Sequence, residues 1–80
     1  MQKQDSSRDT GTIIRFDEER GFGFVRCDRT QMQRFIHHSE IMMEGYRTLR
    51  AGQTVSFITV ADPNGKLLPR AIDVRIEDGN

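Results

Sequence analysis

The sequence RGFGFV at residues 20–25 decides the fold, because its side chains alternate as they do along a β-strand. Successive side chains of a strand point to opposite faces of a sheet. Phe22 and Phe24 therefore share one face, whereas Gly23 and Val25 share the other. Since glycine adds almost nothing to a core, the pattern predicts a strand that presents two rings on one surface.

A second stretch, RFIHH at residues 34–38, repeats this alternation. Phe35 and His37 fall on one face, and Ile36 falls on the other. If the two strands pair, four rings lie on one sheet surface, and Ile36 lies beneath them beside Val25. Rings in a row beside cations are typical of surfaces that bind unstacked nucleic-acid strands. An alternative is that the phenylalanines fill an ordinary core, because short apolar runs are ambiguous.

The length and composition predict one small domain. Eighty residues leave no room for a second domain. The hydrophobic content of 35% supports a small core, which suits a small barrel better than a buried catalytic cleft. No apolar run is long enough to cross a bilayer, and residues 1–10 lack the apolar region of a signal peptide. Cys27 is the single cysteine, so no internal disulfide forms, and we expect a cytoplasmic location.

The charge is balanced over the whole chain but uneven along it. The formal net charge is zero, whereas most nucleic-acid-binding domains are basic. Residues 11–76 contain ten Lys or Arg and eight Asp or Glu, which leaves an excess of +2. The compensating acids are in the two end segments: Asp5, Asp9, Glu77 and Asp78.

Five short strands with turn signals between them predict an all-β barrel or sandwich. Residues 1–10 are polar, and we expect a disordered tail there, followed by a domain at 11–76 and a second tail at 77–80. The strands are expected at residues 12–16, 20–27, 34–38, 53–60 and 70–76.

The side-chain alternation is irregular in the first predicted strand and regular in the last. Ile13 is expected in the core, but Ile14 and Phe16 have the other parity. A β-bulge would reconcile these positions, although the sequence alone does not reveal one. In the last strand, the alternation places three side chains in the core: Ile72, Val74 and Ile76.

Residues 11–74 resemble the bacterial cold-shock domain, which is also the nucleic-acid-binding module of Y-box proteins. The resemblance covers about four fifths of the chain and rests on RGFGFV at residues 20–25 and FIH at 35–37, which resemble the family's two ribonucleoprotein motifs. Further matches are Ser39 and Ile41, the run from Gly45 to Phe57, and Pro69 to Val74. The resemblance implies a five-stranded OB-fold barrel that binds single-stranded RNA and DNA. Members of the family melt weak RNA structure and act in antitermination and translation.

Several positions depart from the family pattern. Arg15 stands where the family normally has Trp, and His38 stands where a Phe normally follows the motif histidine. Removal of one stacked ring weakens binding by about 1–3 kcal/mol. Arg15 can recover part of this by stacking its guanidinium or by contacting a phosphate.

The predicted site has rings that stack on bases and arginines that contact phosphates or base edges. The rings are Phe16, Phe22, Phe24, Phe35, His37, His38 and Tyr46, and the arginines are Arg15, Arg20, Arg26 and Arg70. The expected partner is single-stranded RNA or DNA with a tolerance for pyrimidines, and the protein is expected to be a monomer or weak dimer. It is expected to act as an RNA chaperone or as a regulator of transcription or translation.

Catalysis, a cofactor and a metal site are not expected. Adjacent strand residues face opposite ways, so His37 and His38 are expected to lie apart, and no Cys or His partner shows metal-ligand spacing. The acidic run at residues 17–19 reads as a solvated turn, since nothing near it supplies a nucleophile. An alternative function is a protein-interaction barrel, or the N-terminal module of a longer protein with weakened nucleic-acid binding. The neutral charge and the missing Trp favour that alternative.

Overall fold

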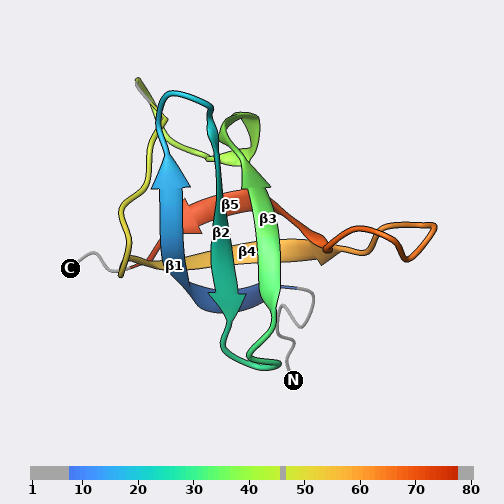
Figure 1. The fold of residues 1–80 in the computed structure, drawn as a ribbon. Coiled ribbons are helices and arrows are strands. Elements are labelled where there is room, and N and C mark those ends of the chain that lie inside the picture. Colours follow the sequence, from blue (N-terminus) through green and yellow to red (C-terminus); the bar gives the residue numbers. More distant parts are fainter. Residues whose placement is uncertain (1–7, 46, 78–80) are drawn as a thin grey trace.

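Five strands close into one barrel in the order β1-β2-β3-β5-β4. The computed structural model describes residues 8–45 and 47–77. Three strands, β1, β2 and β3, run side by side, and β4 and β5 cross behind them (Figure 1). A short 3-10 helix, η1, follows β3. The bounds are β1 Arg8–Asp17, β2 Phe22–Cys27, β3 Gln33–His37, η1 His38–Glu40, β4 Thr54–Val60 and β5 Arg70–Ile76.

The core is small and mostly aliphatic. Val25 and Ile36 are fully buried beneath β2 and β3, as the alternation predicts, and Phe57 of β4 is the largest fully buried side chain. The three phenylalanines of β2 and β3 are not part of this core. Its members are Ile13, Val25, Cys27, Ile36, Ile41, Leu49, Val55, Phe57, Ala71 and Val74.

A bulge in β1 reconciles the irregular alternation of the first strand. Ile13 lies opposite Val25, and Arg15 lies opposite Phe24, so Ile14 is an extra residue on β1. A bulge of this kind bends the strand and shifts its alternation by one residue, so that the side chains beyond it again face the same way as their partners on β2. Ile13 therefore points into the core, whereas Arg15 points outward on the face of Phe24.

The first strand begins earlier than expected. Arg8 to Thr10 pair with β4, so the prediction of a disordered tail over residues 1–10 is wrong for these three. Asp9 is only 8% exposed, and its buried carboxylate accepts hydrogen bonds from Arg29 Nε at 2.9 Å and Thr59 Oγ1 at 2.9 Å. Polar side chains thus form the buried contact here, and a hydrophobic pattern cannot reveal it. Residues 1–7 and 78–80 lie outside the described residues.

A second irregularity, in β5, corrects the predicted core. Ser56 lies opposite Arg75, but Ile58 lies opposite Ile72, so β5 has one residue more than β4 between these pairs. Asp73 takes a φ of 51° within this stretch. Val74 is buried as predicted, whereas Ile72 is only half-buried because the alternation is interrupted.

Among residues 8–45 and 47–77, no helix is long and apolar enough to cross a membrane.

Candidate nucleic-acid interface

Three phenylalanine rings, Phe22, Phe24 and Phe35, form a cluster on the outer face of β2 and β3. We call this cluster, together with His37, the ring surface. Phe22 lies opposite His37 and Phe24 opposite Phe35, and facing residues of an antiparallel pair share a face. The centroid of Phe22 is 6.3 Å from that of Phe24 and 5.6 Å from that of Phe35. The phenylalanine rings are half-buried, and His37 is exposed, so the surface is available to a partner.

The two histidines lie together, contrary to the expectation that they face opposite ways. The ring centroids of His37 and His38 are 4.5 Å apart. The strand ends at His37 and η1 begins at His38, so the strict alternation of a strand no longer applies. His38 also closes over Gly21, where an added Cβ would lie 2.6 Å from His38 Cδ2. The predicted strand at 34–38 therefore ends one residue early, and its last ring is turned back toward the ring surface.

The orientation of His37 is fixed by the turn that follows it. Its Nδ1 accepts a hydrogen bond from the backbone N–H of Ser39 at 3.2 Å, and Ser39 Oγ lies 2.9 Å from the same nitrogen. An Nδ1 that accepts a backbone N–H leaves the proton of a neutral imidazole on Nε2. His37 can therefore stack with its ring and donate a hydrogen bond with its Nε2–H.

Arg15 extends the ring surface across β1. Its Cζ lies 5.3 Å from the centroid of the Phe24 ring, within the range of a cation–π contact. The guanidinium thus lies against the Phe24 ring in the unbound protein, and both expected roles in binding, stacking on a base and phosphate contact, stay predictions. The guanidinium therefore already occupies part of the surface where the family has an indole.

Phe16 is not one of the rings clustered on the outer face, although it lines a hollow at their border. It lies opposite Gly23 and packs against the core, so it belongs to the face opposite Phe22 and Phe24. Gly23 is required by this close approach, because an added Cβ would meet the carbonyl oxygen of Arg15 and lie 2.7 Å from Phe16 Cδ1. The ring surface thus contains fewer phenylalanines than the sequence suggests.

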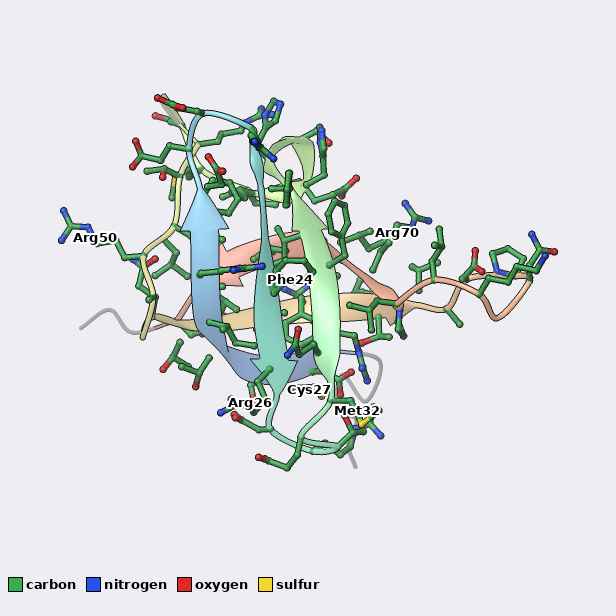
Figure 2. The ribbon with its side chains drawn as sticks, viewed as in Figure 1. Phe24, Arg26, Cys27, Met32, Arg50 and Arg70 are labelled. Atoms are coloured by element: carbon green, nitrogen blue, oxygen red, sulfur yellow. The ribbon has the colours of Figure 1, made fainter. Side chains whose placement is uncertain are left out.

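The predicted arginines are spread around the ring surface. Arg70 lies opposite Phe35 at the meeting of β3 and β5, whereas Arg26 is at the far end of β2 (Figure 2). Arg20 lies in the β1–β2 turn, where its backbone N–H donates to Asp17 Oδ1 at 3.1 Å. Tyr46 lies outside the described residues, so its predicted role stays a prediction.

Two leucines of the β4–β5 loop were not predicted as part of the site. Leu67 is 74% exposed and Leu68 is 45% exposed. With Phe24, Phe35 and Arg70, they line an apolar hollow of about 410 Å³ beside the ring surface. The sequence feature that could have revealed them is the pair of consecutive leucines between the turn at residues 61–66 and the last strand. Adjacent exposed apolar side chains often mark a binding surface.

Neither a metal site nor a catalytic arrangement is seen in the part of the chain that the structure describes. Among residues 8–45 and 47–77, no group of three His, Cys, Asp or Glu side chains could hold a metal ion. Cys27 is buried in the core and carries a free thiol.

A closed five-stranded barrel with rings and arginines on the outer face of its second and third strands is an OB-type barrel. Barrels of this type bind oligonucleotides on that face. Residues 9–76 match the family described as the 'Cold-shock' DNA-binding domain, and the chain belongs to this family. Cold-shock domain proteins bind nucleic acids and are not enzymes, so the expectation of a non-enzymatic binding protein is confirmed.

Individual relatives support the same assignment. A cold shock-like protein of Aquifex aeolicus is 41% identical over 66 residues, which are 82% of this chain and 90% of the relative. The cold shock-like protein CspD of Escherichia coli is 39% identical over 67 residues, 84% of this chain and 90% of the relative. Among solved structures, Drosophila Unr CSD456 has a TM-score of 0.71 and 29% identity, and the match covers 91% of this chain and 28% of that one.

Proposed function

We propose that this protein binds single-stranded RNA or DNA by stacking bases on the ring surface. The observation that carries this proposal is the cluster of three half-buried phenylalanine rings, with centroids 5.6 to 6.3 Å apart, on the outer face of β2 and β3. Core rings would be enclosed, but these rings lie outside the aliphatic core. Base–aromatic stacking contributes about 1–3 kcal/mol per base.

The same geometry favours single strands over duplexes. The bases of a duplex are stacked on each other, so their faces are not available to protein rings. The positive charge that could hold a duplex backbone is largely offset by acidic residues, since residues 11–76 have an excess of only +2. We therefore infer that stacking supplies more of the affinity than phosphate contacts do.

Stacking accepts every base, which supports an RNA chaperone or a regulator of transcription or translation that acts on many sequences. Tolerance for pyrimidine-rich strands, a monomeric or weakly dimeric state and a cytoplasmic location stay predictions.

A fluorescence-anisotropy titration tests the proposed function. The protein is titrated into a labelled pyrimidine-rich single strand of about eight nucleotides, a length within the usual site size of an OB barrel. The control is the same sequence annealed to its complement. We expect clear binding of the single strand and much weaker binding of the duplex. Equal affinity for both would indicate an electrostatic surface and contradict stacking.

A protein partner is the second candidate, and the exposed leucines favour it. Leu67 and Leu68 add an aliphatic area to the ring surface, which a peptide could cover as well as a base. The same titration separates the two functions, because a protein-interaction barrel would leave the single strand unbound at every concentration.

A further inference from the structure

Arg15 and Asp17 stand two residues apart on the outer face of β1. Arg15 lies opposite Phe24, and Asp17 lies opposite Phe22, so both polar side chains share the face of the rings. Two residues of a strand span about 7 Å. A cation and a carboxylate are therefore held side by side along one border of the ring surface.

A hollow of about 460 Å³ lies between these groups. This volume falls within the ~300–1,000 Å³ of small-ligand clefts. The hollow combines aromatic walls, which suit the flat face of a base, with two arginines and one carboxylate. Its lining residues are Arg15, Phe16, Asp17, Arg20, Phe22 and Phe24.

The carboxylate of Asp17 has one oxygen committed to the turn, whereas the other makes only a long ion-pair contact with Arg20. Oδ1 accepts hydrogen bonds from the backbone N–H groups of Glu19 at 3.0 Å and Arg20 at 3.1 Å. Oδ2 has a contact with Arg20 Nε at 3.8 Å, which is longer than a hydrogen bond. The Asp17 side chain is 47% exposed, so Oδ2 can accept a hydrogen bond from a ligand.

These groups match guanine better than the other bases. Arginine donates two hydrogen bonds to the O6 and N7 acceptors of guanine, the commonest specific contact between proteins and DNA. The N1–H and the N2 amine of guanine are donors that a carboxylate oxygen accepts. The other bases lack this combination of two acceptors and two donors. Adenine presents an amine donor beside its N7 acceptor, so it cannot accept two hydrogen bonds from arginine. Cytosine offers the carboxylate one amine, and thymine offers it a single ring N–H.

We propose that the hollow between Arg15 and Asp17 is a guanine-selective subsite, in which Arg15 contacts O6 and N7 and Asp17 Oδ2 accepts from N1 or N2. This inference rests on the proposed function, because the base stacks against Phe22 while the two side chains contact its edges. It adds selectivity at one position of a strand that is otherwise held without regard to sequence.

Anisotropy titrations with a positional scan test the subsite. The reference is a labelled oligothymidine of about eight nucleotides, and in each further strand one thymidine is replaced by deoxyguanosine, deoxyadenosine or deoxycytidine. We expect guanine at one position to raise the affinity roughly 5- to 100-fold, the range for one good bidentate contact. Replacement of that guanine by 7-deazaguanine removes N7, and replacement by hypoxanthine removes the N2 amine. At least one of these analogues should lose most of the gain.

Two variants and one control identify the residues. Arg15→Lys keeps the charge but removes the bidentate fork, and Asp17→Asn keeps the Oδ1 acceptor of the turn but replaces Oδ2 with a donor. Both should abolish the guanine preference. Asp17→Asn should leave oligothymidine binding within a few-fold of wild type, since stacking remains, whereas Arg15→Lys should also weaken oligothymidine binding because Arg15 is part of the ring surface. Arg50→Gln, at an exposed position beyond β1, is the matched control and should leave the preference intact (Figure 2).

The outcomes separate the two levels of the proposal. Binding of oligothymidine with no gain from guanine at any position overturns the subsite and leaves the proposed function standing. A guanine gain that survives both Arg15→Lys and Asp17→Asn also overturns it, because the selectivity then has another source. No binding to any single strand overturns the proposed function and the subsite together.

Discussion

At the scale of single residues, the rings of β2 and β3 can be separated from the core by substitution. We expect Phe24→Ala and Phe35→Ala each to weaken single-strand binding by about 1–3 kcal/mol, since each removes a stacking partner. Both rings are half-buried, so the folded state should survive. Anisotropy gives the affinity, and urea denaturation gives the free energy of unfolding.

The control for these variants is a core residue. Phe57 is fully buried in β4, and Phe57→Leu should lower the free energy of unfolding while the folded protein binds normally. If instead the Phe24 and Phe35 variants behave like Phe57→Leu, these rings belong to the core and the stacking proposal fails.

Arg15 gives a second prediction at the same scale. Because its guanidinium already lies 5.3 Å from the Phe24 centroid, we expect it to contribute by stacking or base contact instead of by a phosphate contact. Arg15→Gln should then lower the affinity at every salt concentration and leave the slope of log K against log salt nearly unchanged. A slope flatter by about 0.7, the share of one phosphate on a single strand, would assign Arg15 to the backbone.

At the scale of the strands, the sequence predicted most of the architecture but not its irregularities. The five strands, the ring surface and the buried Val25 and Ile36 follow from alternation, which a half-buried strand obeys. The bulge at Ile14 could not be predicted, because Ile13 and Ile14 are equally apolar and either could face the core. The pairing of Arg8 to Thr10 was missed for the opposite reason, since its buried contact is polar.

The candidate site shows the same division. Phe22 and Phe24 were found because glycines precede each of them on the strand, and Phe35 was found because it alternates with Ile36. Phe16 was expected among the stacking rings, but the bulge changes the parity before it, so Phe16 packs against the core and only borders the hollow beside Phe22 and Phe24. Asp17 was read as part of a solvated turn, and only the register of β1 against β2 shows that it borders the rings.

Gly23 tests how closely β1 and β2 approach. In Gly23→Ala, the new Cβ would lie 2.7 Å from Phe16 Cδ1 and 2.8 Å from Phe16 Cα, and it would meet the Arg15 carbonyl oxygen. Backbone atoms cannot move aside cheaply, so we expect the free energy of unfolding to fall by about 1–3 kcal/mol or more. Thr12→Ala, an exposed position on β1, is the control and should change stability by less than about 0.5 kcal/mol. A neutral Gly23→Ala would show that the strands can separate without loss.

The polar contact that joins the start of β1 to β4 predicts a dependence on pH. The hydrogen bond from Arg29, aided by that from Thr59, holds the pKa of Asp9 below its usual value of 3.8, although burial opposes this. A carboxyl with a lowered folded-state pKa stabilises the protein above its unfolded pKa, and this contribution is lost as the pH falls through the folded value. Asp9→Asn should lower the free energy of unfolding at neutral pH by roughly 1–3 kcal/mol.

Urea denaturation of both proteins at a series of acidic pH values checks this. The difference in stability between wild type and Asp9→Asn should be constant above the usual pKa of 3.8 and shrink below it. A difference that stays constant down to the lowest pH would show that ionisation of Asp9 makes no contribution.

At the scale of the whole molecule, the charge balance limits how strongly salt can act on binding. An excess of +2 over residues 11–76, with acids at the β1–β2 turn, allows about two to four phosphate contacts. The slope of log K against log salt for a single strand should then lie between about −1.5 and −3. Anisotropy titrations over a salt series measure it, and a slope much steeper than about −4 would contradict binding that depends mainly on stacking.

The extra residue of β1 also affects which changes of length a gene for this protein can accept. Deletion of one residue from a strand normally moves every side chain beyond the deletion to the opposite face of the sheet. Within the bulge, loss of either Ile14 or Arg15 would instead restore a regular ladder, with Phe16 and Asp17 still opposite Gly23 and Phe22. The two deletions differ in which side chain then stands over Phe24, the arginine or the isoleucine. A lineage could thus exchange a cationic surface for an aliphatic one through a deletion, with a straighter β1 as the structural consequence.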